Sequence, residues 1–67
     1  MIRIEFEQEE DGRWIAEIPA LPGVMTYGAT QQEARAEVEA LALRTLADRL
    51  EHGEQKVDLG TISFAAA

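Results

Sequence analysis

One long run of helical periodicity, between Thr30 and Gly53, constrains this 67-residue chain more than any other feature. Apolar or small residues recur in it at the three-and-four spacing of a core-facing helical stripe. The members of this stripe are Ala34, Val38, Leu41, Ala42, Thr45 and Leu46. About a third of the chain is therefore helix, and the remaining residues have to supply the layer that covers the stripe.

The ends of this helix are marked by local signals. Thr30 followed three residues later by Glu33 forms a capping box, in which Thr30 caps the helix and Glu33 reaches back. A glycine, Gly53, suits the position just after a helix. We therefore predict a helix that begins at about Gln31 and ends at Glu51 or His52.

Two segments before the helix have the alternating pattern of half-buried strands. In residues 2–8 the isoleucines and Phe6 alternate with charged residues, and in residues 13–18 Trp14, Ala16 and Ile18 share one face. The acidic segment 9–12 between them ends in Asp-Gly, which predicts a hairpin turn.

The other strands are shorter. Pro22-Gly23 suits the centre of a type II turn and is followed by a predicted strand over residues 24–27. After the helix we predict at least an edge strand over residues 61–64, with a kink at Gly60, and a disordered tail over 65–67. The predicted fold class is α+β in one domain, residues 1–64, with the order β-β-β-α-β and an antiparallel sheet carrying one long helix on one face.

Chain length and composition exclude several function classes. A chain of this size buries only about 60% of the surface of its unfolded form, which argues against a deep enclosed active site. The absence of cysteine excludes disulfides and thiolate chemistry. Small chains without such links often gain stability by association, so we expect a homodimer or homotetramer.

The charge of the chain bears on its partners. Thirteen acidic and six basic side chains give a formal net charge of −7. Binding to nucleic acid or anionic lipid depends on Lys and Arg, so a basic partner is expected instead. No apolar run is long enough to span a membrane, and the N-terminus reads as a strand and not as a signal sequence, which makes the cytoplasm the expected location.

Residues 11–34, DGRWIAEIPALPGVMTYGATQQEA, resemble the HicB-like antitoxins. The shared features are an aromatic residue in the second strand, a P-x-L-P-G turn, a short strand and G-x-T-x-x-E-A at the start of the helix. The resemblance implies a partial ribonuclease-H-like fold and binding to HicA, a small basic toxin that cleaves messenger RNA. Many members also carry a C-terminal DNA-binding segment. Since the chain ends soon after the last strand, operator binding is not expected of it.

Acidic residues on strand faces and in the hairpin turn are the candidates for binding such a toxin. They are Glu5, Glu7, Glu9, Glu10, Asp11 and Glu17. A charge run of this kind is also typical of a merely solvated surface.

A second candidate surface is a flank of the helix formed by Leu43, Ala47 and Leu50. These residues widen the apolar stripe beyond what one sheet needs to cover, so the flank either contacts a second copy or wraps around the chain's own core. The alternative function is accordingly a HicB-like homo-oligomer with a regulatory or ligand-binding role and no toxin.

An enzymatic role is not expected, and we predict no catalytic residue, cofactor or metal. Glu5, Glu17 and Asp58 are conceivable as the remnant of a ribonuclease-H-like metal site, but carboxylates this common form chance clusters. His52 falls at the predicted end of the helix, where a histidine more often caps carbonyl groups than catalyses a reaction.

Overall fold

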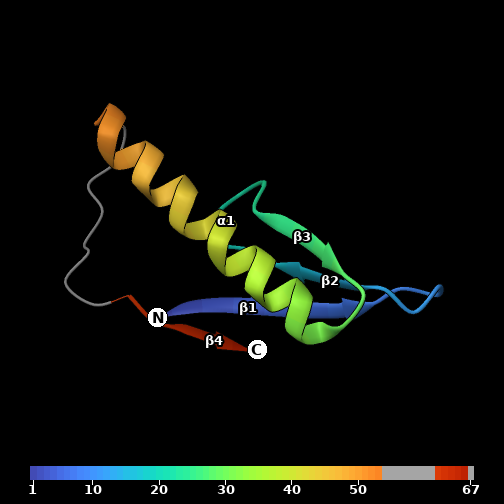
Figure 1. The fold of residues 1–67 in the computed structure, drawn as a ribbon. Helices are drawn as coiled ribbons and strands as arrows, with labels where there is room; N and C mark the ends of the chain where they lie inside the picture. Colours follow the sequence, from blue (N-terminus) through green and yellow to red (C-terminus); the bar gives the residue numbers. More distant parts are fainter. Residues whose placement is uncertain (54–61, 67) are drawn as a thin grey trace.

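A computed structural model describes residues 1–53 and 62–66 of the chain, which fold into one sheet and one helix (Figure 1). The elements in chain order are β1 (Ile2–Gln8), β2 (Trp14–Glu17), β3 (Met25–Gly28), α1 (Gln31–His52) and β4 (Phe64–Ala66). The strands form a four-stranded sheet in the order β3-β2-β1-β4. The predicted α+β class and element order are confirmed.

The last strand differs from its prediction in position and direction. It covers Phe64–Ala66, so Ala65 and Ala66 belong to a strand and not to a disordered tail, whereas residues 60, 61 and 67 lie outside the described part of the chain. β4 pairs with β1 in parallel, which makes the sheet mixed and not antiparallel. The direction has a topological cause. α1 carries the chain back along the sheet, so the next strand runs the same way as β3 and therefore as β1.

The hairpin between β1 and β2 has a three-residue loop, residues 10–12. The backbone N–H of Glu9 donates to the Arg13 carbonyl at 2.7 Å, and that of Gly12 donates to the Glu9 carbonyl at 2.9 Å. Gly12 takes a φ of +92°, as the left-handed position after a type I turn requires. This loop length sets which residues of the two strands face each other.

The connection from β2 to β3 is closed by the predicted proline-glycine turn. The N–H of Val24 donates to the Leu21 carbonyl at 3.0 Å across Pro22 and Gly23, and Gly23 has a φ of +86°. Leu21 and Val24 are both buried, so the turn also contributes to the core.

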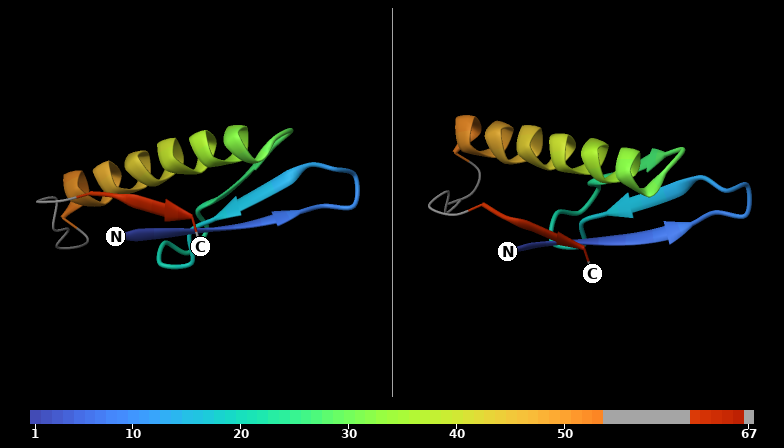
Figure 2. Two further views of the ribbon diagram at one scale, coloured as in Figure 1. Left: turned by 90° about the horizontal axis from the view of Figure 1, so that it is seen from below. Right: turned by 60° about the horizontal axis from the view of Figure 1, so that its bottom comes forward.

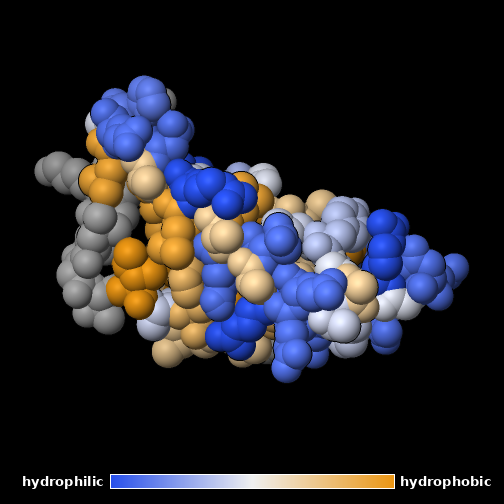
Figure 3. All heavy atoms as spheres, viewed as in Figure 1, coloured by the Kyte–Doolittle hydropathy of each residue, from blue (hydrophilic) through white to orange (hydrophobic). Residues whose placement is uncertain are grey.

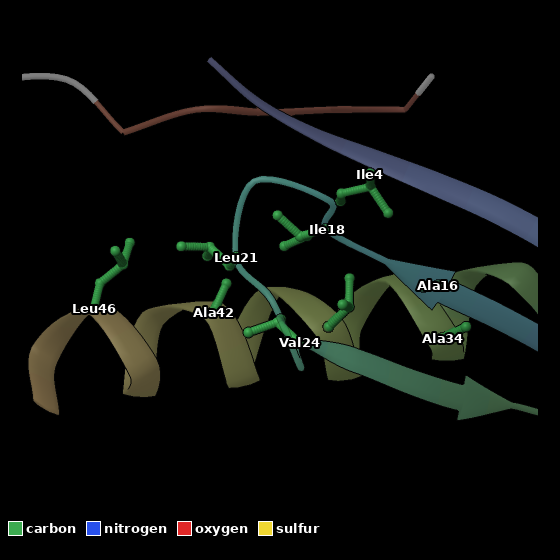
Figure 4. Packing of buried hydrophobic residues seen from close by; sticks show 9 residues of the cluster. Ile4, Ala16, Ile18, Leu21, Val24, Ala34, Ala42 and Leu46 are labelled. Atoms are coloured by element: carbon green, nitrogen blue, oxygen red, sulfur yellow. The ribbon is translucent and has the colours of Figure 1, made fainter. Parts of the chain in front are cut away.

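The core lies between α1 and one face of the sheet, as Figure 4 shows. Its buried members are Ile4, Ala16, Ile18, Leu21, Val24, Ala34, Val38, Ala42 and Leu46. α1 approaches β3 closely, because Gly28 has no side chain and the Thr26 hydroxyl donates to the Ala34 carbonyl at 3.0 Å. The second face of the sheet is not covered by the helix (Figure 2).

Both ends of α1 are capped. The Glu33 N–H donates to the Thr30 hydroxyl at 3.1 Å, while the Glu33 carboxylate accepts from the N–H of Ala29, one residue before the cap itself. At the other end, Gly53 has a φ of +64° and its N–H reaches the Arg49 and Leu50 carbonyls. The helix therefore begins and ends where the sequence predicts.

Removing the N-cap side chain tests how much the cap contributes to the stability of the fold. We expect Thr30→Ala to lower the free energy of unfolding by about 1 kcal/mol, because the Glu33 N–H loses its acceptor, whereas Thr30→Asp, which restores an acceptor, retains most of the stability. Urea denaturation followed by circular dichroism measures both. Equal losses in the two variants would contradict a capping role.

Candidate protein-binding surface

The sheet face turned away from α1 combines apolar and acidic side chains. We call it the open face (Figure 2). Strand alternation and register place on it Arg3, Glu5 and Glu7 of β1, Ile15 and Glu17 of β2, and Met25 and Tyr27 of β3. Every one of these side chains is exposed except that of Ile15, which is half-buried.

The apolar part of the open face lies over β2 and β3. Ile15 pairs directly with Tyr27, and Met25 lies two residues before Tyr27 on the same face. Met25 and Tyr27 remain 44% and 47% exposed. Large apolar side chains gathered on one exposed face are typical of a protein-binding surface. Met25 and Ile15 were not among the predicted binding residues, although they alternate with core residues on the same strands and this alternation indicates that they face outward.

The acidic part of the open face lies next to the apolar part. Glu5 and Glu17 are direct cross-strand neighbours, and Glu7 stands opposite Ile15. Two like charges directly opposite each other in a sheet reduce its stability. The free protein thus carries a small electrostatic cost that a cation from a partner would remove.

The hairpin tip holds the other three predicted acidic residues, Glu9, Glu10 and Asp11, away from the middle of the sheet. Asp11 accepts a hydrogen bond from the backbone N–H of Arg13 at 3.0 Å and from its Nε at 2.8 Å. These bonds, the one from the backbone first, hold the pKa of the Asp11 carboxyl below its ordinary value. The Arg13 guanidinium also lies 5.2 Å from the centre of the Tyr27 ring, which links the tip to the open face.

The six predicted acidic residues are therefore divided between two places. Glu5, Glu7 and Glu17 share the open face, and the other three form the tip. Among the described residues, Asp11 is the one of these six carboxylates engaged in an ion pair, with Arg13.

The predicted helix flank lies on the solvent side of α1. Leu43 and Leu50 are 47% and 42% exposed, and Ala47 is exposed between them. In Figure 3 hydrophilic atoms dominate the hairpin tip and the end of the helix, and hydrophobic atoms are concentrated between the helix and the sheet. Contact of this flank with a second copy stays a prediction.

Of the three residues considered for a ribonuclease-H-like metal site, the described structure brings two carboxylates together. Glu5 and Glu17 are neighbours, but Asp58 lies outside the described residues. Within residues 1–53 and 62–66 no three His, Asp or Glu side chains are grouped so as to hold a metal ion. His52 directs its Nδ1 to the Asp48 carbonyl at 2.7 Å, the capping position that the sequence predicts. The same part of the chain holds no helix long and apolar enough to cross a membrane.

Comparison with known proteins identifies one relative. The chain is similar to the UPF0150 protein Ta0767 of Thermoplasma acidophilum, with 34% identity over 50 residues. The matched region covers 75% of this chain and 71% of the relative. No family model matches the chain, and no solved structure matches it.

Proposed function

The chain belongs to the UPF0150 protein family, and we propose that it is a protein-binding module of the HicB-like antitoxin type. In this proposal it neutralises a small, basic, messenger-RNA-cleaving toxin of the HicA type by direct contact and has no enzymatic activity of its own. Both proteins would act in the cytoplasm, where the toxin meets messenger RNA. The resemblance of residues 11–34 to HicB-like antitoxins supports the class of partner.

The observation that carries the proposal is the open face, on which exposed Met25 and Tyr27 lie beside the Glu5–Glu17 pair. Apolar side chains give a complex its lasting contacts, since their burial contributes roughly 25 cal/mol per Å². Carboxylates attract a basic protein and raise its association rate. A surface that offers both, on a chain of charge −7, suits a partner whose own task is to bind RNA phosphates.

Inhibition would follow from competition. A toxin that cleaves RNA needs a basic surface to hold the phosphates. Carboxylates of the open face would occupy the same cations and repel the substrate, so binding and neutralisation would be one event. Complex formation is then expected to weaken as salt concentration rises.

Co-expression tests this proposal. We expect a small basic protein to be encoded next to this chain, and we expect the chain to restore growth of cells that express that protein and to co-purify with it. Glu37→Lys on the helix is a control for Glu17→Lys on the open face, because both variants change the net charge by the same amount. The Glu37→Lys variant should still restore growth. Failure of the unaltered chain both to restore growth and to co-purify would contradict the antitoxin role.

The exposure of Leu43 and Leu50 on α1 favours a second candidate, a homo-oligomeric domain with a regulatory or ligand-binding role and no toxin. Apolar side chains on the solvent side of a helix are typical of helix-to-helix association. Absence of any toxin partner together with a stable oligomer that Leu43→Glu and Leu50→Glu disrupt would support this alternative.

A further inference from the structure

We infer that two copies of this chain associate through the outer edge of β3, in antiparallel pairing about a two-fold axis, and form one continuous eight-stranded sheet. β3 is an edge strand in the order β3-β2-β1-β4, and no described strand pairs with its outer side (Figure 1). The inference concerns a second copy only and does not depend on the proposed toxin.

The backbone of β3 is prepared for such pairing. The Ile18 N–H donates to the Val24 carbonyl at 3.1 Å, so Val24 directs its backbone groups toward β2. In an antiparallel ladder this direction alternates along the strand. Met25 and Tyr27 therefore direct their N–H and C=O groups outward, to the edge, as a further strand would require.

The edge lacks the features by which proteins usually prevent strand addition. Charged side chains, proline and bulges perform this function on most exposed edges. β3 has the sequence Met-Thr-Tyr-Gly and contains none of these. The other edge strand, β4, also lacks charged side chains, so in a chain with 13 acidic residues the two edges of the sheet are places where two copies repel each other little.

A two-fold axis at Thr26 gives a self-complementary register. Met25 of each copy then stands opposite Tyr27 of the other, and the four outward backbone groups of each strand are all paired. On the open face, Ile15, Tyr27 and Met25 from both copies merge into one apolar strip. A methionine sulfur beside an aromatic ring adds a favourable contact.

The Glu17 carboxylates of the two copies stay apart in this arrangement. Each Glu17 is on β2, one strand inward from the edge, so the two Glu17 residues are separated by three strand spacings, about 14 Å. This separation exceeds the Debye length of about 8 Å at physiological ionic strength. Repulsion between the two Glu17 carboxylates therefore does not prevent association at this edge.

Light scattering on wild-type and edge variants tests the inference. At about 0.1 mM we expect the wild type to have twice the 7.4 kDa of one chain. The double variant Met25→Glu, Tyr27→Glu should be monomeric, because four carboxylates would meet at the edge. Met25→Lys, Tyr27→Glu should restore the dimer, since the register places opposite charges at both contacts. Circular dichroism confirms that each variant is folded.

A matched control lies on the helix. Leu43→Glu, Leu50→Glu adds the same two charges to exposed apolar positions of α1 and should leave the dimer intact. A monomeric wild type would overturn the inference. Dissociation by the helix variant but not by the edge variant would also overturn it and would assign the interface to the helix flank. A dimer in the doubly acidic edge variant, or loss of the dimer in both edge variants, would exclude the proposed register.

Discussion

Gly28→Ala is expected to lower the free energy of unfolding by about 3 kcal/mol. A Cβ atom at Gly28 would lie 2.4 Å from the backbone nitrogen of Ala34 and 2.9 Å from its Cα. These are helix backbone atoms, which cannot turn aside as a side chain can. Either α1 or β3 has to move, and movement would also break the hydrogen bond from the Thr26 hydroxyl to Ala34.

For a domain of this size such a loss corresponds to a fall in Tm of roughly 12–24 °C. Thermal unfolding followed by circular dichroism measures it. Gly23→Ala serves as the control, because that position has a left-handed φ of +86° but nothing within 4 Å of the added Cβ. The control should cost only about 1–2 kcal/mol for backbone strain. A loss in Gly28→Ala no larger than in the control would show that the helix does not rest on β3 as described.

Glu17→Lys is expected to change stability and toxin binding in opposite directions. Glu17 stands directly opposite Glu5, so a lysine there replaces a repulsive cross-strand pair with an attractive one. At an exposed, solvent-screened position this should stabilise the free domain by about 0.5 kcal/mol. The same substitution places a cation beside the exposed apolar strip, where a basic toxin would meet it.

We expect the affinity for the proposed toxin to fall by at least about tenfold, which is 1.4 kcal/mol, mainly through slower association at low salt. Calorimetric titration gives the affinity, and urea denaturation gives the stability of the free domain. Glu37→Lys on α1 should leave the affinity within about twofold of the wild type, since it changes the net charge equally on another surface. Unchanged affinity in Glu17→Lys would exclude the open face as the toxin-binding surface.

Local features of the fold could be predicted closely from the sequence. The helix of residues 31–52 was predictable to within a residue at each end, because Thr30, Glu33 and Gly53 act on backbone groups only a few positions away. Even there, the hydrogen bond of the Glu33 carboxylate goes to Ala29, one residue away from the expected donor. The alternation in residues 2–8 likewise predicted which side chains of this strand point away from the core.

The remaining differences all concern contacts between segments distant in sequence. Phe64–Ala66 has no alternating pattern that would reveal a strand, and it is one because β1 offers it a free edge. Glu5 and Glu17 were both predicted to face outward, but their direct opposition depends on the three-residue hairpin loop, which the acidic segment 9–12 left undetermined. The grouping of Ile15, Met25 and Tyr27 required the register of three strands.

The sequence by itself therefore determined the capped helix, the two alternating strands, the proline-glycine turn and the α+β class, since periodicity and caps act over a few residues. Only the tertiary structure decided the parallel pairing of β4, the close contact of Gly28 with α1 and the composition of the open face. Each of these depends on which segments become neighbours, and a sheet can pair the same strands in several orders and registers. That choice follows from the burial of the common core and not from local pattern.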